Sequence, residues 1–223
     1  MTVYRVNDIY TTVQGEGCQT GTAMVLLRLQ GCGVGCPWCD TKETWESNPK
    51  NARPSIAEAM GANVLYAVTE PRTIAQYIAT QCAGPRWVLI TGGEPAEQPL
   101  GPLVEELQDR GYRVAVETSG TAIGVIGAGA DWVTVSPKIN MPGKRRVLRE
   151  VVEIADEIKF VVGKPADLEA LDQLLADAPT KPGCQIVLQP LSQQMKATHL
   201  CLDTVIARGW RLSVQTHKYL NLP

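Results

Sequence analysis

The amino-acid sequence predicts an α/β fold, namely an incomplete, TIM-like βα barrel of about six βα units around a parallel sheet. Short apolar runs rich in Val, Leu and Ile alternate along the chain with segments of helical periodicity. Right-handed crossovers between parallel strands then curve the sheet into an open or closed barrel. Because the chain has 223 residues, we expect a single domain over residues 1–223 and fewer than eight units.

Each element has a local signal in the sequence. Helical periodicity falls between the apolar runs, and Gly111 and Gly209 stand where helix C-caps are expected. Residues 48–72 interrupt the alternation with three prolines and mixed helical signals, so we interpret them as an insertion after the cysteine-rich loop. The predicted strands cover 24–29, 87–91, 112–117, 132–135, 157–162, 185–189 and 211–214, and the predicted helices cover 73–81, 100–110, 145–155, 167–177 and 194–208.

Composition excludes several classes of protein. The formal charge of -2 gives no electrostatic case for binding nucleic acid, so no nucleic-acid partner is expected. Apolar runs such as residues 23–27 are far too short to cross a bilayer, and residues 1–10 do not resemble a signal peptide. We therefore expect a cytoplasmic protein with no membrane partner.

The cysteines carry the first functional signal. Three of the seven, Cys32, Cys36 and Cys39, form a C-x3-C-x2-C pattern in a glycine-rich loop that follows the predicted strand 24–29. Three thiolates can hold three irons of a [4Fe–4S] cluster, which leaves the fourth iron open to a small molecule. An open coordination position indicates chemistry rather than a structural role, as in catalytic zinc sites.

Zinc is the competing interpretation of this loop, with Cys18, His199 or His217 as a fourth ligand. Tetrahedral zinc sites more often combine two paired half-sites, and the sequence holds no second pair. The remaining thiols, Cys82, Cys184 and Cys201, are scattered, which is typical of small buried apolar residues.

An aromatic residue, Trp38, stands directly before the last cysteine of the loop, and further short motifs extend over nearly the whole chain. They cover residues 13–17, 28–32, 39–41, 91–95, 117–120, 135–138, 188–190 and 215–219. The cysteine pattern with its aromatic residue is similar to the signature of the radical S-adenosylmethionine superfamily. Taken together, the motifs resemble the 7-carboxy-7-deazaguanine synthase family, which makes a precursor of queuosine.

The resemblance implies a definite chemistry. Cys32, Cys36 and Cys39 would hold the [4Fe–4S] cluster, whose open iron binds S-adenosylmethionine and splits it to a 5'-deoxyadenosyl radical. The radical would abstract hydrogen from 6-carboxy-5,6,7,8-tetrahydropterin, whose ring then contracts to 7-carboxy-7-deazaguanine with loss of ammonia. The expected partners are this pterin, a flavodoxin-type or similar reductant, and a second copy of the chain in a homodimer.

The resemblance also assigns residues to the S-adenosylmethionine site. Gly93 ends a strand in a Gly-Gly pair, where backbone carbonyls can approach the methionyl ammonium group. Lys138 has the alternative of a solvated surface lysine, and Pro190 that of a simple turn. The whole expected set is Trp38, Cys39, Asp40, Gly93, Ser136, Pro137, Lys138, Gln189, Pro190, Leu191 and Ser192.

The substrate and Mg2+ sites follow in the same way. Arg28 suits the substrate carboxylate because the guanidinium fork matches it, although an ion pair to a neighbouring acid is the alternative. Thr41 is expected to bind Mg2+, which prefers oxygen ligands, and Asp40 to assist it; the alternative is that either residue caps a helix before 42–46. The expected substrate contacts are Val13, Gln14, Gly15, Arg28, Thr91 and Pro223, with Glu16 as a candidate acceptor from the pterin amine.

Two alternative functions and the role of one residue stay open at this point. A radical-generating activase of another protein would share the cluster, and a zinc-stabilised binding module would be the alternative that is not an enzyme. His217 in the polar segment 215–218 is either a structural residue or part of the site.

Overall fold

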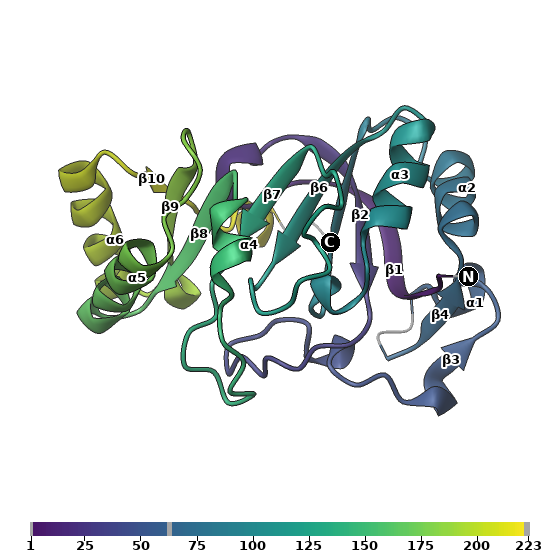
Figure 1. Ribbon diagram of the computed structural model, residues 1–223, viewed down its shortest axis with the longest axis horizontal. Coiled ribbons are helices and arrows are strands. Elements are labelled where there is room, and N and C mark those ends of the chain that lie inside the picture. Colours follow the sequence, from purple (N-terminus) through teal and green to yellow (C-terminus); the bar gives the residue numbers. More distant parts are fainter. Residues whose placement is uncertain (1, 62–63, 221–223) are drawn as a thin grey trace.

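The computed structural model describes residues 2–61 and 64–220, and the ten strands within these ranges form one curved sheet (Figure 1). The strand order is β10-β9-β8-β7-β6-β5-β2-β1-β4-β3, and every neighbouring pair from β10 to β2 is parallel. These seven parallel strands are the seven that the sequence predicts. They are β2 (Ala23–Leu29), β5 (Trp87–Gly92), β6 (Arg113–Thr118), β7 (Trp132–Val135), β8 (Glu157–Val162), β9 (Gln185–Pro190) and β10 (Arg211–Leu212).

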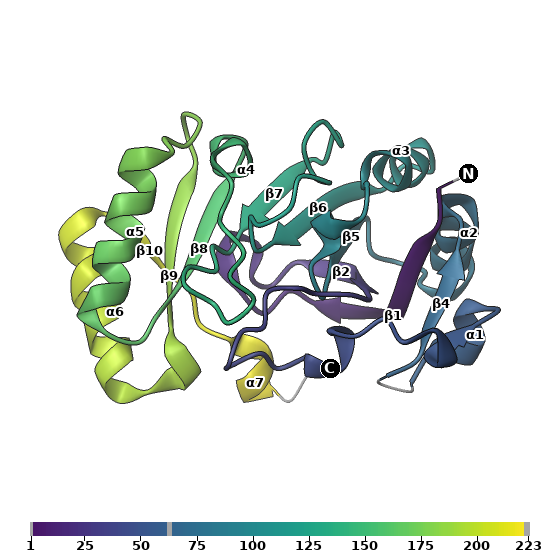
Figure 2. The ribbon, with the colours of Figure 1, turned by 60° about the horizontal axis from the view of Figure 1, so that its bottom comes forward.

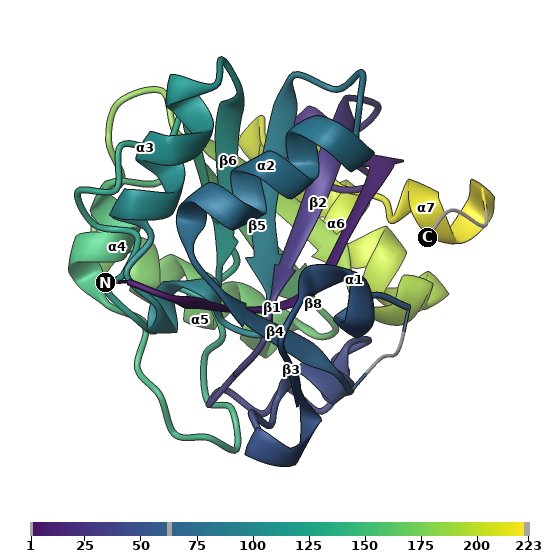
Figure 3. The same ribbon diagram turned by 90° about the vertical axis from the view of Figure 1, so that its right-hand side faces the viewer.

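The long helices cover the outer, convex face of the sheet (Figure 2). In Figure 3, α2 and α3 lie side by side over the outer face of β2, β5 and β6. Gly209 ends α6 in a left-handed conformation, as predicted, with φ of 66°. The helices are α2 (Pro71–Gln81), α3 (Gly101–Asp109), α4 (Arg149–Glu153), α5 (Pro165–Asp177), α6 (Met195–Arg208) and α7 (Thr216–Leu220).

The helix predicted over 145–155 is shorter than expected. Leu148 is extended, and its amide donates to the Gly120 carbonyl at 2.8 Å, so helix α4 begins only at Arg149. A backbone amide used in this way cannot join a helix. Residues 141–147 instead run as a loop beside the cysteine-rich loop, where the Gly143 amide donates to the Val34 carbonyl at 3.0 Å.

The sequence analysis missed the strand β1 (Tyr4–Val13), which pairs antiparallel with β2 and β4. The sheet is therefore mostly parallel, as predicted, with an antiparallel edge at β1 that the sequence analysis did not predict. A signal was present, because most residues of β1 are aromatic or β-branched, although the alternation is broken between Val6 and Asp8 and no side chain after Ile9 is buried.

The predicted insertion over 48–72 extends the same sheet beyond β1. Ile56 and Ala59 are buried against the core, and the Ser55 hydroxyl accepts from the Glu58 amide to cap the short helix between them. This segment contains the 3₁₀ turn η3 (Pro49–Asn51), β3 (Ala52–Arg53), α1 (Ile56–Ala59) and β4 (Tyr66–Thr69).

Alternation along the parallel strands divides the side chains between two environments. On β2, Val25 and Leu27 belong to the main core, whereas Met24, Leu26 and Arg28 face the inside of the barrel. Arg28, Thr91 and Glu117 are polar interior positions toward the carboxyl ends of β2, β5 and β6, where α/β folds place their sites.

The β1–β2 loop and the C-terminal segment meet across the gap that is left because the barrel is incomplete. The β1–β2 loop carries the 3₁₀ turn η1 (Gly17–Gln19), which contacts β8 and β9. The Gly17 amide donates to the Ser213 hydroxyl at 2.9 Å, and the Thr216 amide donates to the Gly15 carbonyl at 2.9 Å. The seam between residues 14–17 and 213–218 therefore holds the first loop against the C-terminal segment.

We expect Glu157→Gln to remove a pH-dependent loss of stability. Glu157 is 1% exposed, its Oε2 accepts from the Cys18 amide at 3.1 Å, and its Oε1 has no hydrogen-bond partner among the described residues. Burial raises the pKa of Glu157 above that of the unfolded chain, so its contribution to stability is lost as the pH rises through the folded-state pKa. The uncharged amide of the variant loses nothing over this range.

Chemical denaturation at pH 4 and pH 8 checks this prediction. The free energy of unfolding of the variant, relative to that of the natural protein, should be higher at pH 8 than at pH 4. Parallel pH profiles for the two proteins would show that Glu157 is charged when folded.

Within residues 2–61 and 64–220, no helix has both the length and the apolar composition that a membrane span requires.

Candidate active site

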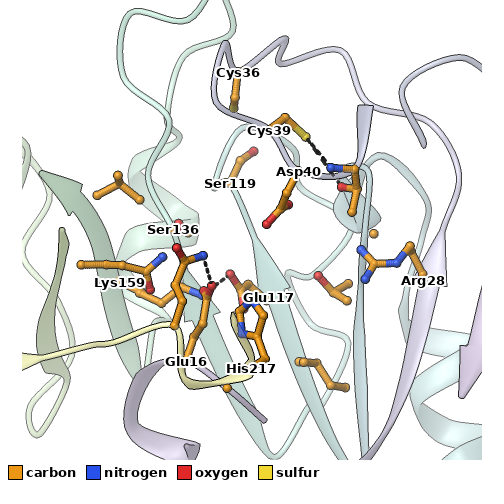
Figure 4. Close-up of a pocket in the computed structure, with 18 of the residues that line it drawn as sticks. Glu16, Arg28, Cys36, Cys39, Asp40, Glu117, Ser119, Ser136, Lys159 and His217 are labelled. Atoms are coloured by element: carbon orange, nitrogen blue, oxygen red, sulfur yellow. Dashed lines mark hydrogen bonds and ion pairs between the residues drawn. The ribbon is translucent and has the colours of Figure 1, made fainter. Parts of the chain in front are cut away.

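A cavity of about 520 Å³ opens at the carboxyl ends of the parallel strands. Figure 4 shows Cys36 and Cys39 at one end of it, Arg28 on one side, and Glu16, Lys159 and His217 on the other. The predicted site residues that line the cavity are Val13, Gln14, Gly15, Glu16, Arg28, Cys32, Cys36, Trp38, Cys39, Asp40, Thr41, Thr91, Gly93, Ser136, Lys138, Gln189, Pro190, Leu191, Ser192 and His217.

The cysteine-rich loop between β2 and the 3₁₀ turn η2 (Lys42–Thr44) is tightly folded. The Cys39 amide donates to the Cys36 carbonyl at 3.1 Å, and Gly35 has a φ of 73° that favours glycine. All three thiols are free of disulfides. Burial raises the pKa of the Cys32 thiol to about 11 and also raises the pKa of Cys36, so these two thiols are protonated at neutral pH when no metal is bound.

The donor set of this loop fits a cluster held by three thiolates better than it fits a single zinc ion. Three cysteines line one cavity from one loop, while Cys18 lies outside it, with its amide bonded to Glu157. Within 2–61 and 64–220, no group of three or more His, Cys, Asp or Glu side chains is gathered closely enough to hold one metal ion.

The Gly92-Gly93 pair lets the end of β5 pass against the cysteine-rich loop. A Cβ on Gly92 would lie 2.3 Å from the Leu29 backbone, and one on Gly93 would lie 2.2 Å from the Gly31 carbonyl oxygen. Beside them, the buried Glu94 amide donates to the same Gly31 oxygen at 2.8 Å. Only glycine allows this approach, which exposes backbone to the cavity.

Arg28 and Thr91 are neighbours in the register of β2 and β5, and both side chains line the cavity. The Arg28 Nη2 donates to the Tyr10 hydroxyl at 3.1 Å. Among the described residues Arg28 forms no ion pair within 4.0 Å, so its fork is available to an anionic ligand.

Lys159 is the centre of a buried charge network on the opposite wall. Its side chain is 3% exposed, and its Nζ pairs with Glu16 and, at 2.6 Å, with the Glu117 carboxylate. Burial alone would lower the pKa of Lys159, but the Glu117 and Glu16 carboxylates raise it. Against the opposing effect of burial, Lys159 lowers the pKa of Glu16 to about 2, so Lys159 and Glu16 are both charged at neutral pH.

This network reaches the C-terminal segment. The Gln215 Nε2 donates to Glu16 at 2.7 Å, and the Lys218 Nζ donates to the Gln215 Oε1 at 2.8 Å (Figure 4 shows the Glu16 end). Lys218 in turn lies 4.0 Å from the Asp40 carboxylate of the cysteine-rich loop. One wall of the cavity is therefore held together by alternating charges and amides.

Comparisons with known proteins give one answer. No family model matches the chain. The 7-carboxy-7-deazaguanine synthase of Escherichia coli K12 is 45% identical over 221 residues, which cover 98% of this chain and 99% of the relative. The enzyme of the same name from Synechocystis is 33% identical over 98% of this chain and 93% of the relative. The chain belongs to the 7-carboxy-7-deazaguanine synthase family.

A solved structure agrees with this family assignment. The crystal structure of QueE from Escherichia coli superposes with a TM-score of 0.88 at 42% identity, and the match covers 96% of this chain and 94% of that one. The resemblance inferred from the motifs is thus confirmed, and so is the fold class of an incomplete βα barrel.

The other predicted cofactor residues of this synthase chain lie at or directly after the carboxyl ends of β7 and β9. The Lys138 Nζ donates to the Ser136 carbonyl at 3.0 Å and to its hydroxyl at 2.5 Å, and the Gln189 Oε1 accepts from Ser213 at 2.9 Å. A second cavity of about 510 Å³ shares Trp38 and Leu191 with the first. Pro137 lines only this second cavity, and Pro223 lies outside the described residues.

Thr41 and Asp40 occupy the turn after the last cysteine. Thr41 takes the N-cap position of η2, but its side chain forms no capping hydrogen bond and lies 3.6 Å from the Cys39 sulfur. The Asp40 side chain is 63% exposed. The capping alternative is therefore wrong for the side chain of Thr41, and its Mg2+ role stays a prediction.

Trp45 and Lys159 are among the cavity residues that were missed from the sequence, and Glu117 stood in the motif 117–120 without an assigned role. A lysine at the centre of the apolar run 157–162 was a usable signal, because an unpaired lysine is costly there. Trp45 gave no signal, because its approach to Cys39 depends on the fold of the turn between them.

Proposed function

We propose that this chain converts 6-carboxy-5,6,7,8-tetrahydropterin to 7-carboxy-7-deazaguanine by radical ring contraction with loss of ammonia. The observation that carries the proposal is the convergence of three free cysteines, the Gly92-Gly93 turn and Arg28 on one cavity in a chain of this family. This arrangement suits an iron–sulfur cluster at the cysteine end of the cavity and a ring whose carboxylate lies beside Arg28.

The cofactor end is assigned to the cysteine-rich loop and the strand ends around it. Cys32, Cys36 and Cys39 hold a [4Fe–4S] cluster, which, with S-adenosylmethionine bound, supplies the radical that abstracts hydrogen from the substrate. Backbone carbonyls at Gly93 accept from the methionyl ammonium group. The other contacts are assigned to Trp38, Cys39, Asp40, Ser136, Pro137, Lys138, Gln189, Pro190, Leu191 and Ser192.

The substrate end is assigned to the opposite side of the cavity. Arg28 binds the substrate carboxylate, beside Thr91, and Val13, Gln14, Gly15 and the terminal Pro223 contact the pterin. Lys159 keeps Glu16 charged and holds Glu16 and Glu117 in place, so that carboxylate oxygens face the polar edge of the ring.

Several accessory assignments complete the proposal. Thr41 binds Mg2+ through its hydroxyl, which lines the cavity, and the ion keeps several waters. A flavodoxin-type protein reduces the cluster, the chain acts as a homodimer in the cytoplasm, and residues 1–223 form one domain. These assignments rest on the family to which the chain belongs.

The two rival functions receive less support. An activase acts on a glycine loop of another protein, whereas this cavity is bounded by the seam between residues 14–17 and 213–218. A zinc-binding module requires a fourth ligand. Cys18 and His199 do not line the cavity, whereas His217 does, and the described residues hold no group of three or more His, Cys, Asp or Glu side chains close enough for one metal ion.

Anaerobic turnover tests the proposal. Reconstituted, reduced protein is incubated with S-adenosylmethionine, Mg2+ and the carboxytetrahydropterin, and the products are separated by chromatography. Formation of 7-carboxy-7-deazaguanine and ammonia is expected. If the loaded protein forms neither this product nor 5'-deoxyadenosine, the proposed function is wrong.

We expect Arg28→Gln to lower kcat/KM about ten- to hundredfold. The substitution removes a charge-assisted pair to the substrate carboxylate, worth about 1.5 to 3 kcal/mol, and each 1.4 kcal/mol is tenfold. Steady-state kinetics with the carboxytetrahydropterin measures the effect. The matched control is Arg113→Gln, at the amino end of β6, where Arg113 is exposed over the Trp87 ring. Equal losses in both variants would contradict the assignment of Arg28.

A further inference from the structure

The turn that follows the cysteine-rich loop folds back onto it. The Gly31 amide donates to the Thr44 carbonyl at 2.7 Å, and the Cys32 amide donates to the Trp45 carbonyl at 3.0 Å. The Gln30 side chain adds hydrogen bonds to the carbonyls of Glu43 at 2.9 Å and Glu46 at 2.7 Å. Residues 43–46 are thus fixed by their backbone to the first part of the loop.

This anchorage directs the indole of Trp45 at the last cysteine. The Trp45 Nε1–H donates to the Cys39 sulfur at 3.4 Å, and the Thr41 amide donates to the same sulfur at 3.4 Å. The Trp45 ring is half-buried and lines the cavity, and the Lys42 ammonium lies 5.9 Å from its centroid. One residue therefore contacts the sulfur of Cys39 through its side chain and the amide of Cys32 through its carbonyl.

We propose that Trp45 is a positioning residue that sets the reduction potential of the cluster through its hydrogen bond to Cys39. The inference rests on the proposed function, because it requires a cluster ligated by this thiolate. Reduction adds one negative charge to the cluster and its sulfurs, so an N–H donor stabilises the reduced state more than the oxidised one. The indole of Trp45 thereby makes the cluster easier to reduce.

The substitution Trp45→Phe separates this role from packing, because it keeps a ring of similar shape and removes the donor. The matched control is Trp132→Phe at the floor of the barrel, which removes an indole hydrogen bond of 3.1 Å to the Thr134 hydroxyl. Iron and sulfide analysis first establishes that each variant carries the full cluster, about four irons per chain.

The experiment is an anaerobic redox titration followed by electron paramagnetic resonance. At the midpoint potential of the natural protein, we expect the reduced-to-oxidised ratio of Trp45→Phe to fall about three- to tenfold, where tenfold corresponds to about 59 mV for one electron. The control should keep the natural midpoint. An unchanged midpoint in fully loaded Trp45→Phe would overturn the inference.

If Trp45→Phe does not take up the cluster, a second measurement tests the inference on the natural protein. The natural protein is labelled with 15N in its indole nitrogens, and electron–nuclear double resonance is recorded on the reduced cluster. A 15N coupling from an indole beside the cluster is expected, and it should remain in Trp38→Phe, which excludes Trp38 as its source; the absence of such a coupling overturns the inference. A chain that takes up no iron and sulfide overturns the proposed function as well, whereas a loaded chain without the coupling overturns this inference alone.

Discussion

Replacing Lys159 by methionine is expected to lower the free energy of unfolding by about 3 to 5 kcal/mol at pH 7. The substitution keeps an unbranched side chain that is one atom shorter, but it leaves the Glu16 and Glu117 carboxylates facing each other without their shared cation. Removing one partner of a buried ion pair is costly because the remaining charge is neither hydrated nor compensated. For a chain of this length the melting temperature should fall by roughly 6 to 20 °C.

The pH dependence distinguishes this electrostatic effect from a packing defect. In the natural protein the pKa of Glu16 is lowered to about 2, so its stabilisation is complete above the unfolded pKa and is lost as the pH falls toward 2. Without Lys159 the pKa of Glu16 rises, so the deficit of the variant should shrink as the pH falls from 7 to 4.

Denaturation curves at both pH values measure this effect, with Lys196→Met on the exposed surface of α6 as the control. Adding Glu117→Gln to Lys159→Met should restore part of the stability, because it removes one of the two uncompensated charges. A deficit that is constant with pH and unaffected by Glu117→Gln would indicate lost packing alone.

Replacing Cys36 by alanine is expected to abolish both cluster uptake and turnover. The thiol lies in the cavity, and two remaining thiolates cannot hold a cluster that uses three. Iron should fall from about four per chain to well below one, and 5'-deoxyadenosine and 7-carboxy-7-deazaguanine should fall to background. Iron analysis, the visible absorption spectrum and product chromatography measure these three effects.

The control for Cys36→Ala is Cys18→Ala. Cys18 was the candidate fourth ligand in the zinc interpretation, and it lies outside the cavity with its amide bonded to Glu157. This variant should keep its iron and its turnover. Loss of metal from Cys18→Ala, together with zinc in place of iron, would favour the binding module.

Most of the barrel could be predicted because each of its parallel strands has a recognisable local sequence pattern. Runs such as Trp87–Gly92 are apolar throughout, as buried parallel strands are, and the structure contains all seven such runs as strands. The strand Tyr4–Val13 was missed because it is antiparallel to β2 and no α-helix separates the two strands, so it does not follow the alternation of strands and helices on which the prediction was based. The helix over 145–155 was too long because one tertiary hydrogen bond at Leu148 ends it.

The site was predictable only where chemistry is concentrated in a few adjacent residues. Cys32, Cys36 and Cys39 form a motif whose spacing alone indicates a cluster. The partners of Lys159 are 42 or more positions away in the chain, so no local pattern could pair it with Glu16 and Glu117. Their meeting depends on the curvature of the sheet. The assigned roles and the single domain over 1–223 stay predictions.

The seam between residues 14–17 and 213–218 has a consequence for the lifetime of the native state. Glu16 meets Lys159 across 143 positions and Gln215 across 199. Contacts of such span close late, because the entropy of joining distant segments must be overcome first. We therefore expect Glu16→Gln to accelerate unfolding while leaving the refolding rate nearly unchanged. The seam would then govern how long a molecule stays folded rather than how quickly it folds.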